Sequence, residues 1–134
     1  DSIQQSATLH NVAAHILFLG VVTDPQQLAI VYEAADIHVF PVRYIPDDPE
    51  GFGMVAVEAA AHGTPTVAFA TGGVVDAVAE GVSGYLVEKN NYSQLSKQVI
   101  TLLANPLPKE NIQDFARQFE WSRFGQGIVQ QMER

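Results

Sequence analysis

The chain has 134 residues, enough for one domain of ordinary size, and 47% of them are hydrophobic, enough for a core. It carries 15 acidic and only 7 basic residues, for a net charge of −8, so it lacks the clustered cations of a nucleic-acid surface. The absence of cysteine excludes disulfides, cysteine zinc sites and thiol chemistry. No apolar run reaches the ~18 residues of a membrane span and no signal peptide opens the sequence, which predicts a cytoplasmic protein.

In chain order, the sequence predicts an opening helix followed by alternating strands and helices. The strand signals are short, mostly continuous apolar runs, as expected where both faces of a sheet are covered. They are residues 15–19, 37–40, 66–70 and 85–87. This alternation predicts an α/β fold, a Rossmann-like parallel sheet flanked by helices.

Capping residues and helix breakers predict where the intervening helices begin and end. Asp24 and Pro25 read as the N-cap and first turn of one helix, and Gly63 with Pro65 ends another that starts near Phe52. Apolar patterns predict the remaining helices between Gly73 and Gly81, from Asn91 to before Pro106, around Ile112 to Phe119, and after Ser122.

The most informative stretch follows the second predicted strand. Residues 41–50 form a loop with three prolines, placed where open α/β sheets bind ligands, and Glu50 ends it. Gly51-Phe52-Gly53 then opens a helix. Glycines there let the backbone approach a ligand, whose negative charge the free N–H groups favour, or they serve a turn that needs positive φ.

Glu58 interrupts an otherwise apolar helix eight residues after Glu50. On one continuous helix the two carboxylates would be separated by ~12 Å of rise, too far to share a proton or a metal. Three interpretations of Glu58 stay open: a position at a solvent edge, an ion pair with an internal Arg or His, or a carboxylate that accepts hydrogen bonds from a ligand's hydroxyls.

Three further features bear on the site. Gly72 and Gly73 repeat the glycine-rich arrangement after the third predicted strand and would form a second wall of one cleft, or an ordinary tight turn. Arg43 would meet a phosphate, or lie exposed in its loop. The histidines show no metal-ligand spacing, so no metal is expected, and His38 reads as a core residue.

Taken together, these motifs resemble the C-terminal half of the retaining glycosyltransferases of family 4, the group 1 glycosyl transferases with the GT-B architecture. The resemblance covers nearly the whole chain. Its blocks are residues 18–22, 28–36, 39–41, 50–53, 57–61, 63–67, 72–73, 81–87 and 121–122.

The resemblance implies a domain, residues 1–134, that binds a nucleoside-diphosphate sugar and needs no cofactor or metal. In that family, the first glutamate supports the reacting centre, which places Glu50 by the donor sugar as the catalytic residue. Backbone N–H groups of Phe52, Gly53 and Met54 would touch the sugar and diphosphate. Glu58 would accept hydrogen bonds from the ribose hydroxyls.

The family's donor domain normally begins with two more strands that carry the diphosphate-binding Arg and Lys, and these are not identifiable here. The resemblance therefore implies a fragment of a longer two-domain enzyme, without its N-terminal acceptor-binding domain and inactive alone; whether that enzyme associates with membrane stays open. In a doubly wound sheet the absent strands would join the run at 15–19 to the rest, so without them this run has no neighbouring strand.

Two alternatives to glycosyl transfer also stay open: a nucleotide-sugar epimerase of the same architecture, and a non-catalytic nucleotide-sugar-binding domain.

Overall fold

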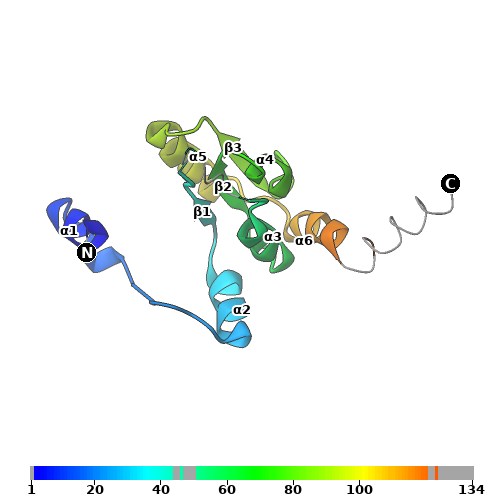
Figure 1. The fold of residues 1–134 in the computed structure, drawn as a ribbon, viewed down its shortest axis with the longest axis horizontal. Coiled ribbons are helices and arrows are strands. Elements are labelled where there is room, and N and C mark those ends of the chain that lie inside the picture. Colours follow the sequence, from blue (N-terminus) through cyan, green and yellow to red (C-terminus); the bar gives the residue numbers. More distant parts are fainter. Residues whose placement is uncertain (1, 44–45, 47–50, 121–122, 124–134) are drawn as a thin grey trace.

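The computed structural model describes residues 2–43, 46, 51–120 and 123. Strands and helices alternate through the middle of the chain, as the sequence predicts (Figure 1). The helices are α1 (Ser2–Leu9), α2 (Pro25–Ala34), α3 (Met54–Ala61), α4 (Val74–Ala77), α5 (Tyr92–Ala104) and α6 (Lys109–Ala116), with 3-10 turns η1 (Ala13–His15) and η2 (Arg117–Phe119). The strands are β1 (His38–Phe40), β2 (Thr66–Phe69) and β3 (Gly84–Val87).

The strands form one parallel sheet in the order β1-β2-β3. Val39 of β1 pairs with Val67 of β2, which pairs with Tyr85 of β3. Each connection between neighbouring strands contains a helix, as parallel pairing requires. The predicted α/β fold with a parallel sheet flanked by helices is confirmed.

Helices cover both faces of the sheet (Figure 1). On one face Val67 and Phe69 of β2 pack with Leu95 and Leu102 of α5. On the other, Ala68 joins a cluster built by α3, α4 and α6. Every residue of β2 is buried, which explains why its sequence is continuously apolar apart from Thr66.

The prediction of a strand at residues 15–19 is wrong. His15 ends the turn η1, and the residues after it run in irregular structure up to α2, with Leu17 82% and Val21 90% exposed. In Figure 1 this run and α1 lie away from the sheet. An apolar run becomes a strand only when a neighbour supplies the ladder hydrogen bonds, and none of the described strands lies beside it.

Several predicted helix ends are confirmed. The Asp24 side chain accepts a hydrogen bond from the Gln26 N–H, Asn91 caps α5 in the same way, and Gly63 follows α3 with φ +78°.

The helix expected from Gly73 to Gly81 is shorter than predicted, because α4 ends at Ala77. Beyond it, the Ala79 N–H donates to Ser83 Oγ instead of to a helical carbonyl. The helix expected after Ser122 lies outside the described residues, apart from Arg123.

Candidate functional site

Two glycine-rich junctions meet at the carboxyl edge of the sheet. The first junction, residues 51–53, leads into α3, and the second junction, residues 71–73, leads from β2 into α4. A Cβ atom added to Gly73 would lie 2.7 Å from the Gly51 carbonyl oxygen and 2.9 Å from Phe52 Cα. The backbones of the two junctions are therefore in contact, and this contact requires glycine at 73.

Gly53 sets the start of α3. Its φ of +79° is in the left-handed region, where glycine is favoured, and it forms the N-cap of the helix. Val74, Ala77 and Phe40 enclose it, and their nearest atoms would lie 3.3–3.6 Å from an added Cβ. The need for positive φ, one of the two interpretations of this glycine, is confirmed.

The first two residues of α3, Met54 and Val55, are exposed beside this contact, whereas the next two are buried. Gly51 and Met54 are exposed, whereas the Phe52 ring packs on Phe119 with ring centres 5.3 Å apart. The first N–H groups of any helix lack intrahelical partners and carry the positive end of its dipole. The arrangement is chemically suited to an anion that approaches along the backbone.

Thr71 of the second junction has a buried hydroxyl. The residue is 4% exposed, and its Oγ1 has no hydrogen-bond partner among the described residues. A buried hydroxyl without a hydrogen-bond partner destabilises the fold. Thr71 is therefore a position in the second junction at which the described residues leave a polar group without a hydrogen bond.

Glu58 lies on the exposed side of α3, so of its three interpretations the solvent edge describes its position. It is one turn into the helix, ~6 Å of rise from Met54, and helical side chains lean toward the amino end. Its carboxylate thus lies on the side of α3 that leads back to the first junction. The Tyr32 O–H donates to Glu58 Oε2 over 3.4 Å.

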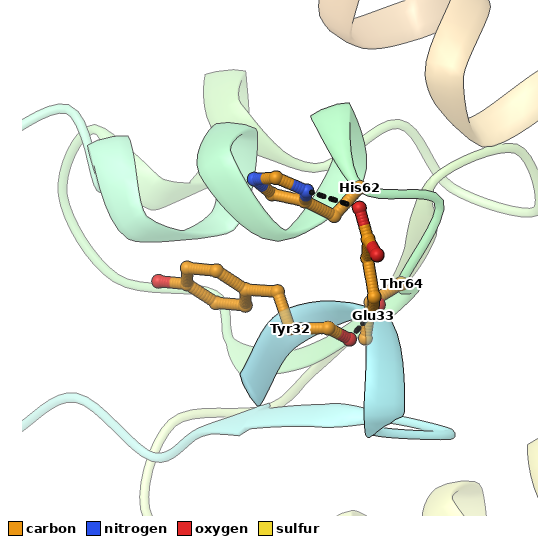
Figure 2. Close-up of polar contacts among 4 residues, drawn as sticks. All are labelled: Tyr32, Glu33, His62 and Thr64. Atoms are coloured by element: carbon orange, nitrogen blue, oxygen red, sulfur yellow. Dashed lines mark hydrogen bonds and ion pairs between the residues drawn. The ribbon is translucent and has the colours of Figure 1, made fainter. Parts of the chain in front are cut away.

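The Tyr32 side chain is held between α2 and α3 (Figure 2). Its ring stacks on the His62 ring, with centres 5.7 Å apart and planes 9° from parallel. The Thr64 hydroxyl donates to the Tyr32 carbonyl oxygen over 2.6 Å, and His62 Nδ1 lies 3.3 Å from Glu33 Oε1. These contacts fix the end of α2 against the end of α3.

Two side chains in this region have altered proton affinity. Burial raises the pKa of Tyr32 above its ordinary value of 10.0, and the negative charge and hydrogen bond of Glu58 add to the rise. Burial lowers the pKa of His38 below 6.5, and its Nδ1 lies 3.1 Å from Thr66 Oγ1. The sequence predicts His38 as a satisfied core residue: it is hydrogen-bonded as predicted, but it is only half-buried.

The remaining predicted site residues are placed unequally. Glu50, the predicted catalytic residue, lies outside the described residues. Arg43 is exposed after β1, and Gly72, with φ +52°, is exposed beside Gly73. No group of three or more His, Cys, Asp or Glu in the described part of the chain could hold a metal ion.

Sequence reasoning missed Tyr32, His62, Thr64 and Thr71. Tyr32 reads in the sequence as one member of an apolar helix face, and its partners Glu58, His62 and Thr64 are more than 25 residues away. Only the packing of α2 on α3 brings them together. A threonine before a Gly-Gly pair carried no signal that its hydroxyl would be buried without a partner.

Comparison with known proteins identifies the family of the chain. The family model described as glycosyl transferases group 1 matches residues 1–119. The D-inositol 3-phosphate glycosyltransferase of Corynebacterium aurimucosum is 37% identical over 124 residues, covering 86% of this chain and 28% of that protein. The chain is therefore an α/β domain that belongs to the group 1 glycosyl transferases.

Solved structures show the same fold. Sucrose-phosphate synthase from Thermosynechococcus elongatus superposes with a TM-score of 0.81 at 29% identity, over 98% of this chain and 33% of that one. Anabaena HepE in complex with UDP gives 0.79 at 28% identity, over 98% and 36%. The chain thus spans about a third or less of the length of these relatives. Within the described residues, no helix is long and apolar enough to cross a bilayer.

Proposed function

We propose that this chain is the donor-binding part of a retaining glycosyltransferase and binds a nucleoside-diphosphate sugar. The contact between the two glycine-rich junctions at the carboxyl edge of the sheet is the observation that carries the proposal. It sets the partly exposed start of α3 beside a second loop, and the family match supports glycosyl transfer as the chemistry. The Anabaena structure, solved with UDP, supports a nucleotide as part of the ligand.

Each predicted residue has a role in this proposal. N–H groups of Phe52, Gly53 and Met54 donate to the sugar and diphosphate, and the helix dipole of α3 adds to the attraction. Gly72 and Gly73 shape the facing wall. Arg43 meets a phosphate oxygen, and the site uses no metal.

Glu58 and Glu50 have different tasks. The exposed carboxylate of Glu58 accepts hydrogen bonds from the ribose hydroxyls. Glu50 orients the donor sugar and stabilises the positive charge that develops as the bond between the anomeric carbon and the diphosphate breaks. The acceptor hydroxyl then bonds to that carbon on the same face and gives its proton to the departing diphosphate oxygen, so nucleoside diphosphate is released and the configuration is kept.

The remaining parts of the enzyme belong to the same proposal. The acceptor site lies in an N-terminal domain of a longer protein, and two preceding strands carry the cations that bind the diphosphate. The cytoplasmic location stays a prediction, and membrane association of the longer protein stays open.

Binding and product analysis on the full-length protein test the proposal. We expect calorimetry to detect binding of at least one of UDP, GDP and ADP. With the matching sugar donor, we expect free nucleoside diphosphate and a glycoside of unchanged anomeric configuration. An epimerised nucleotide sugar, an inverted glycoside, or no binding of any of the three would refute it.

A further inference from the structure

The exposed carboxylate of Glu58 has a neighbour that family resemblance does not assign. Tyr32 comes from a different helix, 26 positions earlier in the chain, and its hydroxyl lies 3.4 Å from Glu58 Oε2. This distance is long for an O–H···O bond, so the contact orients the carboxylate more than it binds it tightly.

The position of the Tyr32 ring is set by contacts on two sides. One face stacks on His62, and the edge of the ring meets His38, with centres 6.0 Å apart and planes 83° from parallel. Both arrangements are favourable aromatic geometries. With the ring fixed in this way, the hydroxyl is directed along α3 toward Glu58 and has little freedom to leave it.

The backbone of Tyr32 is anchored as well. None of the residues of α2 is fully buried, so hydrophobic burial contributes little to its placement. The Thr64 hydroxyl bonds to the Tyr32 carbonyl oxygen, and Glu33 approaches His62 on the same side (Figure 2). Polar contacts centred on Tyr32 therefore attach α2 to α3.

A carboxylate offers more acceptor positions than one phenol uses. Its two oxygens accept about four hydrogen bonds, so Oε1 stays available when Tyr32 donates to Oε2. A phenol with a raised pKa stays protonated and keeps donating throughout the neutral range. Glu58 is thereby restricted in orientation without being neutralised.

We infer that Tyr32 is a positioning residue that holds the Glu58 carboxylate in the orientation in which it accepts the ribose hydroxyls of a nucleoside diphosphate. This inference rests on the proposed function. It adds a residue of α2 to a site otherwise built from the two junctions and α3.

Nucleotide binding by the full-length protein tests the inference. Calorimetry first selects whichever of UDP, GDP and ADP binds, and then compares it with its 2′,3′-dideoxy counterpart, which offers Glu58 no ribose hydroxyl. We expect Tyr32→Phe to raise the Kd of the ribonucleotide about threefold to tenfold, because a carboxylate that is no longer oriented accepts the hydroxyls less well. The Kd of the dideoxy counterpart stays unchanged, so the variant discriminates less than the wild type.

Two further variants sharpen the result. In a Glu58→Ala background, Tyr32→Phe has no additional effect on the Kd, because the carboxylate it orients is gone. Tyr92→Phe is the matched control: it also removes a phenol hydroxyl, but from α5, where the ring lies edge-on to Phe69. We expect it to leave both affinities unchanged.

The outcomes separate the inference from the function beneath it. A wild-type protein that binds none of the three nucleotides refutes both. If the wild type binds the ribonucleotide no more tightly than its dideoxy counterpart, then Glu58 does not bind the ribose and the inference for Tyr32 is wrong as well. If the wild type prefers the ribonucleotide and Tyr32→Phe keeps that preference, or weakens all the nucleotides equally, only the inference is wrong.

Discussion

Two buried threonines, one at the first position of β2 and one in the second junction after it, differ in one respect. Thr66 is 1% exposed and shares a hydrogen bond with His38, whereas the Thr71 hydroxyl has no partner among the described residues. Replacing either by valine keeps the shape and removes the hydroxyl. The pair therefore compares a satisfied with an unsatisfied buried hydroxyl.

We expect opposite consequences for stability. Thr66→Val leaves His38 Nδ1 unpaired and lowers the free energy of unfolding by about 1–3 kcal/mol, whereas Thr71→Val is neutral or stabilising. Urea denaturation of the two full-length variants, run together, measures the difference. A loss for Thr71→Val as large as for Thr66→Val would show that the Thr71 hydroxyl has a partner.

His38 predicts a pH dependence of stability. Burial lowers its pKa in the folded state below the ordinary value of 6.5, so the unfolded chain binds the proton more readily. Stability is therefore fully present above 6.5 and is lost as the pH falls from 6.5 through the lower, folded value.

Asparagine at this position tests the assignment, since its amide occupies about the place of Nδ1 but does not titrate. We expect His38→Asn to reduce the loss of stability on acidification, measured as the urea midpoint at a series of pH values on either side of 6.5. An unchanged slope would assign the effect to other groups.

At the level of elements, the contact between the junctions makes position 73 sensitive to size. Gly73 has an ordinary φ of −72°, so alanine there is not strained by its backbone and acts only through its Cβ. That atom would meet backbone atoms of Gly51 and Phe52, which cannot rotate away. Gly51 itself has open space around it.

We expect Gly73→Ala to lower stability by about 1–3 kcal/mol through overpacking and to weaken nucleoside diphosphate binding. For stability, Gly51→Ala is the control and is expected to be nearly neutral, because an added Cβ meets nothing within 4 Å. Thermal melting and calorimetry on the full-length variants measure the two effects. Equal stability of both variants would contradict the close packing of the junctions.

The elements that sequence predicts well are those whose signals are local. Asp24 and Gly63 end helices by hydrogen bonding and backbone conformation within a few residues, and β2 is recognisable from continuous burial. The run at 15–19 has the same local signal as β2 but no neighbouring strand, and neighbours cannot be read from the run itself. The position of Glu58 at the solvent edge is one of three that the sequence leaves open, because the sequence does not show which side of α3 is covered.

The same limit applies to the site. The Gly-x-Gly and Gly-Gly motifs indicate that two junctions approach something, and their mutual contact follows from parallel strands ending at one edge. The Tyr32–His62 stacking depends on the angle between two helices, which no spacing encodes. Polar partners across helices are therefore the part of this site that required a structure.

At the scale of the whole molecule, the chain spans only part of the length of its relatives, so we expect it to carry only part of the function. The chain covers 28% of the Corynebacterium aurimucosum protein and 33% of sucrose-phosphate synthase. We expect the isolated 134 residues to show negligible transferase activity, because both the acceptor site and the diphosphate-binding cations are proposed to lie elsewhere. Assay of this chain beside the full-length protein, with the same donor and acceptor, is decisive: measurable turnover by the chain alone would overturn the division.

The irregular run between η1 and α2 has a practical consequence. Leu17 and Val21 stand almost fully in solvent, on a backbone that no described strand borders. An extended apolar segment in that condition can recruit an identical segment from another molecule, as exposed sheet edges do. We therefore expect concentrated samples of this chain to aggregate through this run, and charged substitutions at both positions to reduce the aggregation.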